Sequence, residues 1–216
     1  MFDKIRIVVI NFQTPDLLKI TIESLRKFYR NTKTTIIDNG SKDNSREVIE
    51  KIRKDFPDST ETLILDKNIY HGPAMHYALN KVKEEYVFFL DSDTEIKRGK
   101  FLELMFAELE SSETAYAVGK QITVNKRGFL DEKGNTILTP AYMMLRRHLY
   151  PYFPPFEHHG QPVMKNFIAA YQKGYEIKSF PIEDFIDHKL RGTASKFGYG
   201  LGWNGKIDFV LNKLGF

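Results

Sequence analysis

The chain has 216 residues, no cysteine and a formal net charge of +4. This length suits one α/β domain with one sizeable core. The lack of cysteine excludes disulfide bonds, a thiolate nucleophile and cysteine-ligated zinc, and it favours a cytoplasmic location. The positive charge is weak and dispersed, so we expect no nucleic-acid partner. No apolar run reaches the ~20 residues of a membrane span, and no signal-peptide pattern is recognised at the start of the sequence.

Strand and helix patterns alternate through the first half of the chain. A helix is predicted to begin at Pro15, because proline suits the first helical turn. Apolar residues at helical spacing predict two more helices, one near residues 48–56 and one over 73–83. Between them we expect strands at residues 4–11, 34–38, 63–65 and 86–90. This alternation predicts βαβ units and a mainly parallel sheet.

The second half of the chain is less regular. Helices are predicted at residues 101–109 and 163–173, and strands at 116–123 and 177–180. Turn residues at 125–128 and 132–135 indicate a hairpin. Neither repeats nor a low-complexity linker interrupts the sequence, so one domain over residues 1–216 is expected, with halves of about 1–96 and 97–216.

The stretch Val87-Phe88-Phe89-Leu90-Asp91-Ser92-Asp93-Thr94 joins an apolar run to two carboxylates. The run indicates a buried strand, and it places Asp91 and Asp93 where that strand ends. Open α/β sheets bind ligands beside the carboxyl ends of their strands. Two like charges there repel unless a cation or water separates them, and Mg²⁺ or Mn²⁺ prefers such oxygens. A solvated acidic turn is the alternative.

Two other predicted strand ends carry ligand-type residues, at positions 11–14 and 38–41. These ends share one edge of a parallel sheet with Asp91, so a nucleotide would lie across them. The Asp38 carboxylate would accept a hydrogen bond from a base N–H group, or it would only cap its loop. A P-loop motif does not occur in the sequence.

The ordered set of motifs resembles family 2 glycosyltransferases of GT-A fold. The segments that carry the likeness are Ile7-Val8-Val9-Ile10-Asn11, Ile36-Ile37-Asp38-Asn39-Gly40-Ser41, Asn68-Ile69-Tyr70-His71-Gly72-Pro73-Ala74 and Phe88-Phe89-Leu90-Asp91-Ser92-Asp93. They lie in the expected order within residues 5–96. The resemblance implies a single Rossmann-like α/β domain with a mainly parallel central sheet and a less regular C-terminal acceptor region.

The resemblance also implies inverting, divalent-metal-dependent transfer from a nucleotide-diphosphate sugar. UDP-sugar is favoured, and GDP- and dTDP-sugars stay open. Asp91, Asp93 and His188 would hold Mg²⁺ or Mn²⁺. The donor-binding residues implied are Asn11, Gln13, Thr14, Asp38, Asn39, Lys67, Asn68, Gly72, Asp91, Ser92 and Arg191.

An inverting transfer also needs a base to take the proton of the acceptor hydroxyl. The acidic pair that the family usually carries before its last helix is absent here. Glu157 is the nearest carboxylate, and His158 is a chemical substitute. Glu183, Asp184 and Asp187 are later candidates.

The acceptor side is expected from the second half, as a glycan, a lipid-linked precursor or a small molecule. Segment 206–216 is basic and amphipathic, which suits either a peripheral membrane contact or packing on its own domain. The aromatic residues before the last helix form either a sugar-stacking wall or ordinary core; they are Tyr142, Tyr150, Tyr152, Phe153 and Phe156.

Two other functions stay open. The Asp91 strand also resembles the nucleophile strand of haloacid-dehalogenase phosphatases, in which Asp91 would be phosphorylated and Asp93 would be the acid. That strand normally opens its fold, whereas here it is the fourth predicted strand. A non-catalytic nucleotide-sugar-binding module is the other alternative, and the missing acidic pair favours it.

Overall fold

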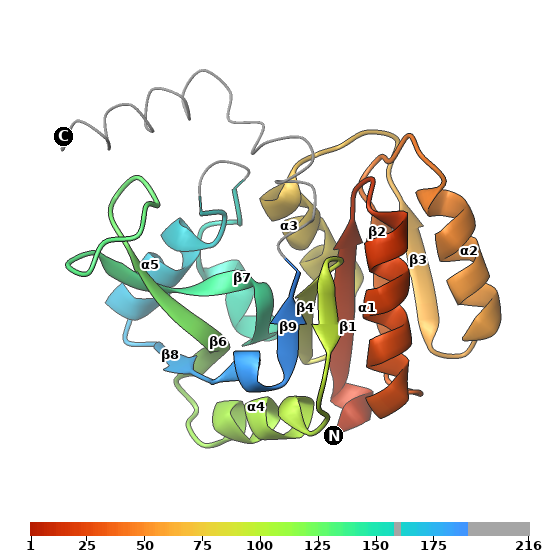
Figure 1. Ribbon diagram of the computed structural model, residues 1–216. Helices are drawn as coiled ribbons and strands as arrows, with labels where there is room; N and C mark the ends of the chain where they lie inside the picture. Colours follow the sequence, from red (N-terminus) through yellow and green to blue (C-terminus); the bar gives the residue numbers. More distant parts are fainter. Residues whose placement is uncertain (158–160, 190–216) are drawn as a thin grey trace.

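Seven strands form one mixed sheet in the order β3-β2-β1-β4-β7-β6-β8 (Figure 1). The structure, a computed structural model, describes residues 1–157 and 161–189. Strands β1 to β4 are parallel, and β7 runs antiparallel to both β4 and β6. The strands are β1 (Ile5–Asn11), β2 (Thr34–Asp38), β3 (Thr60–Ile64), β4 (Tyr86–Asp91), β6 (Ala115–Val124), β7 (Asn135–Arg146) and β8 (Glu176–Ser179).

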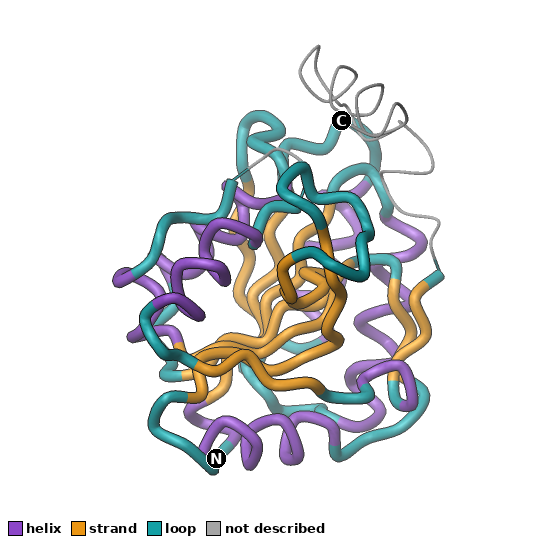
Figure 2. The backbone as a smooth tube through the Cα atoms, turned by 90° about the vertical axis from the view of Figure 1, so that its left-hand side faces the viewer, coloured by secondary structure: helices purple, strands orange, loops and turns teal. Residues whose placement is uncertain are grey.

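Helices cover both faces of this sheet, which lies between two helical layers (Figure 2). Side chains alternate along a strand, so Ile7 and Val9 of β1 join one core cluster while Val8 and Ile10 join the other. One face packs on α1 (Pro15–Phe28), α2 (Ser45–Asp55) and α4 (Phe101–Glu110), and the other on α3 (His71–Lys81) and α5 (Met164–Gln172). Short 3-10 helices occur at η1 (Phe2–Lys4), η2 (Arg147–Tyr152) and η3 (Ile182–Asp184).

A second, two-stranded sheet lies on the α1 and α4 side of the molecule (Figure 1). It pairs β5 (Thr94–Ile96) antiparallel with β9 (Ile186–His188). The Thr21 hydroxyl of α1 lies 2.9 Å from the Ser92 carbonyl oxygen and 2.7 Å from that of Thr94. Helix α1 therefore fixes the chain on both sides of Asp93.

The α/β architecture with a mainly parallel sheet confirms the prediction from sequence. The predicted hairpin is present as β6 and β7. Three elements begin two or three residues earlier than predicted: α2 starts at Ser45, β3 starts at Thr60, and α3 starts at His71 rather than at Pro73. Helix α3 accommodates Pro73 because a proline in the first turn disrupts no intrahelical hydrogen bond.

The aromatic residues before α5 are mostly core, not an exposed wall. Tyr150, Phe153 and Phe156 are buried in the cluster beneath α3 and α5. Tyr142 is also buried, on the opposite face. Only Tyr152 of this group is open, at 62% exposure. A stacking surface made of all five rings is therefore excluded. None of the helices in residues 1–157 and 161–189 is long and apolar enough to cross a membrane.

A buried ion pair joins β1 to the loop before β4. The Arg6 guanidinium lies 2.6 Å from a Glu84 carboxylate oxygen, and the two side chains are only 6% and 7% exposed. Burial alone would raise the pKa of Glu84, but the hydrogen bond and charge of Arg6 outweigh it and lower that pKa. The pair holds the amino ends of two central strands.

We expect Glu84→Gln to lower the free energy of unfolding by about 2 kcal/mol, because it leaves the buried Arg6 charge with the more exposed Glu61 carboxylate, at 3.1 Å, as its remaining ion-pair partner. Urea unfolding at neutral pH measures this. The Glu84 pKa is lowered on folding. The ionised Glu84 therefore contributes its full stability above the ordinary pKa of a glutamate, and this contribution is lost as the pH falls through the pKa of the folded state. Wild-type stability should therefore fall more steeply in acid than that of the variant.

The matched control is Glu85→Gln. Glu85 pairs with Lys4 at 3.2 Å, and both side chains are at least half exposed. We expect a loss of less than about 0.5 kcal/mol for this variant. Equal losses for the two variants would contradict the structural role assigned to Arg6 and Glu84.

Candidate metal and nucleotide site

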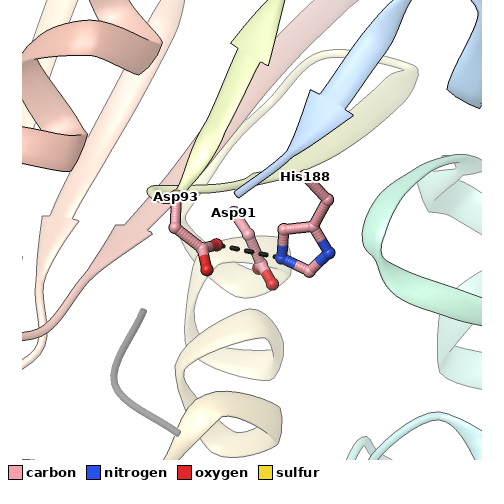
Figure 3. Close-up of side chains that lie close together, drawn as sticks. All are labelled: Asp91, Asp93 and His188. Carbon is pink, nitrogen blue, oxygen red and sulfur yellow. Dashed lines mark hydrogen bonds and ion pairs between the residues drawn. The ribbon is translucent and has the colours of Figure 1, made fainter. Parts of the chain in front are cut away.

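Three side chains of the types that ligate divalent cations converge at the carboxyl end of β4 (Figure 3). Asp91 ends β4, Asp93 lies in the turn to β5, and His188 ends β9. One ligand atom from each lies within 4.8 Å of the others. His188 Nε2 is 3.0 Å from Asp93 Oδ1. The three residues predicted from sequence as the metal group are thus brought together.

The small sheet brings His188 to the acidic turn. Thr94 pairs with His188 in the β5–β9 register, and the Lys189 N–H group donates to the Asp93 carbonyl at 2.8 Å. Ser92, between the two aspartates, joins the turn to the loop after β1, because its buried hydroxyl lies 2.9 Å from that of Thr14. Pairing across 95 residues, not local sequence, therefore completes the group.

Burial and charge act together on these side chains. Burial raises the pKa of Asp91, and the Asp93 carboxylate raises it further, whereas His71 and His188 oppose this. Burial would lower the pKa of His188, but the hydrogen bond and charge of Asp93 outweigh it and raise that pKa. A cation between the carboxylates would relieve their repulsion. Two carboxylates and an imidazole are ligands that suit Mn²⁺, and the two carboxylates also suit Mg²⁺, which prefers oxygen ligands. The donor set therefore fits the predicted ion.

The ends of β1 and β2 form the adjoining polar edge. Asn11 and Asp38 face each other in the strand register. The buried Asp38 carboxylate accepts from the Ser41 N–H group at 3.4 Å and from Arg46 Nε at 3.3 Å. Asn11 accepts from the Thr14 hydroxyl at 2.9 Å. These side chains therefore also hold the loops of their own strands.

The loops after β1, β2 and β3 are tied to each other. The Gln13 N–H group donates to the Ser41 hydroxyl at 3.0 Å. Asn39 Nδ2 donates to Asn68 Oδ1 at 3.1 Å. A Cβ at Gly40, whose φ is +78°, would lie 2.3 Å from the backbone of Lys67, so only glycine fits there. Lys67 and Asn68 are exposed beside this junction.

Gly72 and Glu157, predicted as donor and catalytic residues, are neighbours in space. A Cβ at Gly72 would lie 1.7 Å from the Glu157 carbonyl oxygen. The Glu157 carboxylate pairs with Lys165 Nζ at 3.0 Å and is 44% exposed. His158 and Arg191, also predicted as site residues, lie outside the described residues.

Three residues at this edge were not predicted as metal- or donor-site residues, although Tyr142 was expected among the acceptor-side aromatic residues. Arg46 holds Asp38, and the buried Tyr142 ring lies edge-on to His188 with centroids 5.8 Å apart. His71, the first residue of α3, lies with Nε2 3.6 Å from Asp91 Oδ1. A residue at a helix start is visible in the sequence, but its distance to another strand is not.

Open α/β sheets bind ligands beside the carboxyl ends of their strands, where Asn11, Asp38 and Asp91 lie in this structure. The family described as Glycosyl transferase family 2 matches residues 6–172, and the chain belongs to this family. The family match does not agree with the phosphatase alternative, and β4 is the fourth strand of the chain rather than the first.

Known proteins resemble this chain in sequence or in fold. A teichoic acid poly(glycerol phosphate) polymerase of Staphylococcus epidermidis is 27% identical over 95 residues, which are 44% of this chain and 13% of that protein. The mannosyltransferase PcManGT from Pyrobaculum calidifontis, solved with GDP-Man and Mn²⁺, superposes with a TM-score of 0.69 at 14% identity, covering 82% of this chain and 55% of that one.

The S. aureus TarS 1–349 in complex with UDP-GlcNAc gives a TM-score of 0.62 at 19% identity, covering 87% of this chain and 60% of that one. These structural likenesses confirm the GT-A fold. The chain therefore spans less than two thirds of each of these proteins.

We expect Gly72→Ala to lower the free energy of unfolding by about 2 kcal/mol, because the added methyl group meets a backbone carbonyl that no rotamer change relieves. Thermal or urea unfolding measures this loss. The matched control is Gly99→Ala, whose Cβ would have the Phe28 side chain as its nearest neighbour, at 3.0 Å. A control as damaging as Gly72→Ala would show that the contact with Glu157 is not the cause.

Proposed function

We propose that this protein transfers a sugar from a nucleotide-diphosphate donor to an acceptor hydroxyl, with inversion and with the help of Mg²⁺ or Mn²⁺. The observation that carries the proposal is the convergence of Asp91, Asp93 and His188 on the edge that also holds Asn11 and Asp38. Family membership supports glycosyl transfer as the reaction class. A location in the cytoplasm, with or without contact to its membrane surface, is part of the proposal.

The donor would lie across the ends of β2, β1 and β4. Asp38 would accept from the base, at one end of this edge. The loop residues Asn11, Gln13, Thr14 and Asn39 would shape the nucleotide pocket, with Lys67, Asn68, Gly72 and Ser92 around it. Solved proteins of this fold carry GDP-Man and UDP-GlcNAc, which supports a nucleotide-sugar donor and leaves the base open between uridine, guanosine and thymidine.

The metal would be held by Asp91, Asp93 and His188. When bound, a divalent cation neutralises the charge that develops on the leaving nucleoside diphosphate. The chain's own contribution is to fix these side chains before the donor binds. Asp93 is held by His188 and by the β5–β9 pairing, and Thr94 donates to the Asp91 carbonyl at 2.8 Å.

The acceptor hydroxyl needs a base, for which Glu157 is our candidate, with His158 as the alternative. The Glu157 backbone packs on the start of α3, the helix whose first residue faces Asp91. Its carboxylate is partly exposed and within reach of solvent. The acceptor itself is proposed only by class, as a glycan, a lipid-linked precursor or a small molecule.

Donor binding is tested by calorimetric titration with UDP, GDP and dTDP, with and without Mn²⁺. We expect one nucleotide to bind in a metal-dependent way. We also expect Asp93→Asn to weaken this binding at least about tenfold, because a carboxylate that holds the cation is lost. Asp187→Asn is the matched control, since Asp187 is adjacent to His188 in sequence but pairs with Lys97 at 3.5 Å. Failure of the folded protein to bind any of the three would overturn the nucleotide-sugar proposal.

Turnover is tested separately with Glu157→Gln. We expect kcat to fall by about 100-fold or more with nucleotide affinity unchanged, since the variant keeps the shape of the side chain but loses its base. The measurement is release of the nucleoside diphosphate from the matching sugar donor over a panel of acceptors. Unchanged turnover would move the role of base to another residue, and wild-type binding without turnover would favour the binding-module alternative.

A further inference from the structure

We propose that His71 is a donor-binding residue whose Nε2–H group hydrogen-bonds to a terminal-phosphate oxygen of the nucleoside diphosphate. This inference rests on the proposed function, which places the diphosphate beside Asp91 and Asp93. It adds to that site a residue that lies in one of the quoted motif segments but was given no role there, and that the metal group does not contain.

The first observation is an unpartnered nitrogen. His71 Nε2 is buried from solvent and has no hydrogen-bond partner among the described residues. Its nearest carboxylate oxygen, Asp91 Oδ1, lies 3.6 Å away, beyond hydrogen-bond distance. Two other imidazoles differ in this respect, since His76 lies 2.8 Å from the Tyr150 hydroxyl and His188 lies 3.0 Å from Asp93. In the tautomer that carries its proton on Nε2, this is a buried donor without an acceptor, which is costly and calls for a ligand or another explanation.

The second observation is the backbone that positions His71. Tyr70 has a φ of +69°, a left-handed conformation that non-glycine residues rarely adopt. Asn68 and Asn39 hold this conformation: Asn68 Oδ1 accepts from the Tyr70 N–H group at 2.7 Å, and Asn39 Nδ2 donates to the Tyr70 carbonyl at 3.3 Å. Strain that neighbouring side chains maintain is a feature of ligand sites. Here it places the next residue opposite Asp91.

The third observation concerns the chemistry of the ligand. An N–H donor needs an acceptor, and a phosphate oxygen is a strong, charged acceptor. His71 is also the first residue of α3, and the helix has no side-chain cap at this end. The partial positive charge of a helix start favours an anion beside it. Together these features favour a phosphate oxygen over a neutral hydroxyl as the partner of His71.

Calorimetric titration of matched nucleotide pairs tests the inference: UDP with UMP, GDP with GMP, and dTDP with dTMP, all with Mn²⁺. We expect His71→Leu to lower the affinity for the diphosphate that the wild type binds by about tenfold. The affinity for the corresponding monophosphate should fall by less than about twofold. His71→Gln should restore affinity to within about threefold of wild type, because its amide keeps an N–H donor at the end of a side chain of similar length.

His148→Leu is the matched control, because His148 is exposed in η2, and it should change neither affinity. Equal weakening of diphosphate and monophosphate, or no weakening, would overturn the role of His71. Loss of Mn²⁺ affinity in the absence of nucleotide would also overturn it, because His71 would then be a metal ligand. Wild-type protein that binds no nucleotide would overturn the proposed function itself, before any variant is compared.

Discussion

Repulsion between two carboxylates at the end of a buried strand is the constraint on which this site depends. Four apolar residues fix β4 in the centre of the sheet, so Asp91 and Asp93 cannot move apart into solvent without breaking the turn to β5. The protein offsets the repulsion only in part, with an imidazole on each side, His188 near Asp93 and His71 near Asp91. The negative charge that remains at this site would favour the binding of a cation.

The β5–β9 sheet converts this local constraint into a long-range one. Asp93 is positioned by backbone pairing with a strand that arrives almost at the end of the described chain, and Thr21 of α1 holds the same turn from the other side. The acidic turn is therefore complete only when the second half has folded onto the first. This coupling makes the geometry of the metal group a property of the whole domain rather than of the Asp-x-Asp segment.

The sequence could predict the parts of this site that follow from strand ends. Asn11, Asp38 and Asp91 terminate apolar runs, and parallel pairing places such ends at one edge. Predicting β5 and β9 was not possible, because three-residue strands have no period to detect. His188 was predicted from a family resemblance. His71 lies in a family-like segment but received no role, because the left-handed Tyr70 that places it opposite Asp91 depends on a hydrogen bond from the distant Asn39 as well as one to Asn68.

Polar groups at this edge are of two kinds: some are hydrogen-bonded within the protein, and others are not. Asn11, Thr14 and Ser92 hydrogen-bond within the protein, so their hydroxyl and amide groups are largely satisfied before any ligand arrives. Asp91 and His71 lie close together without a hydrogen bond between them. A ligand gains most from groups whose hydrogen bonds are still open, because no internal bond must break first. Substitutions in the first group should therefore disturb loop geometry, and substitutions in the second should act directly on the bound ligand.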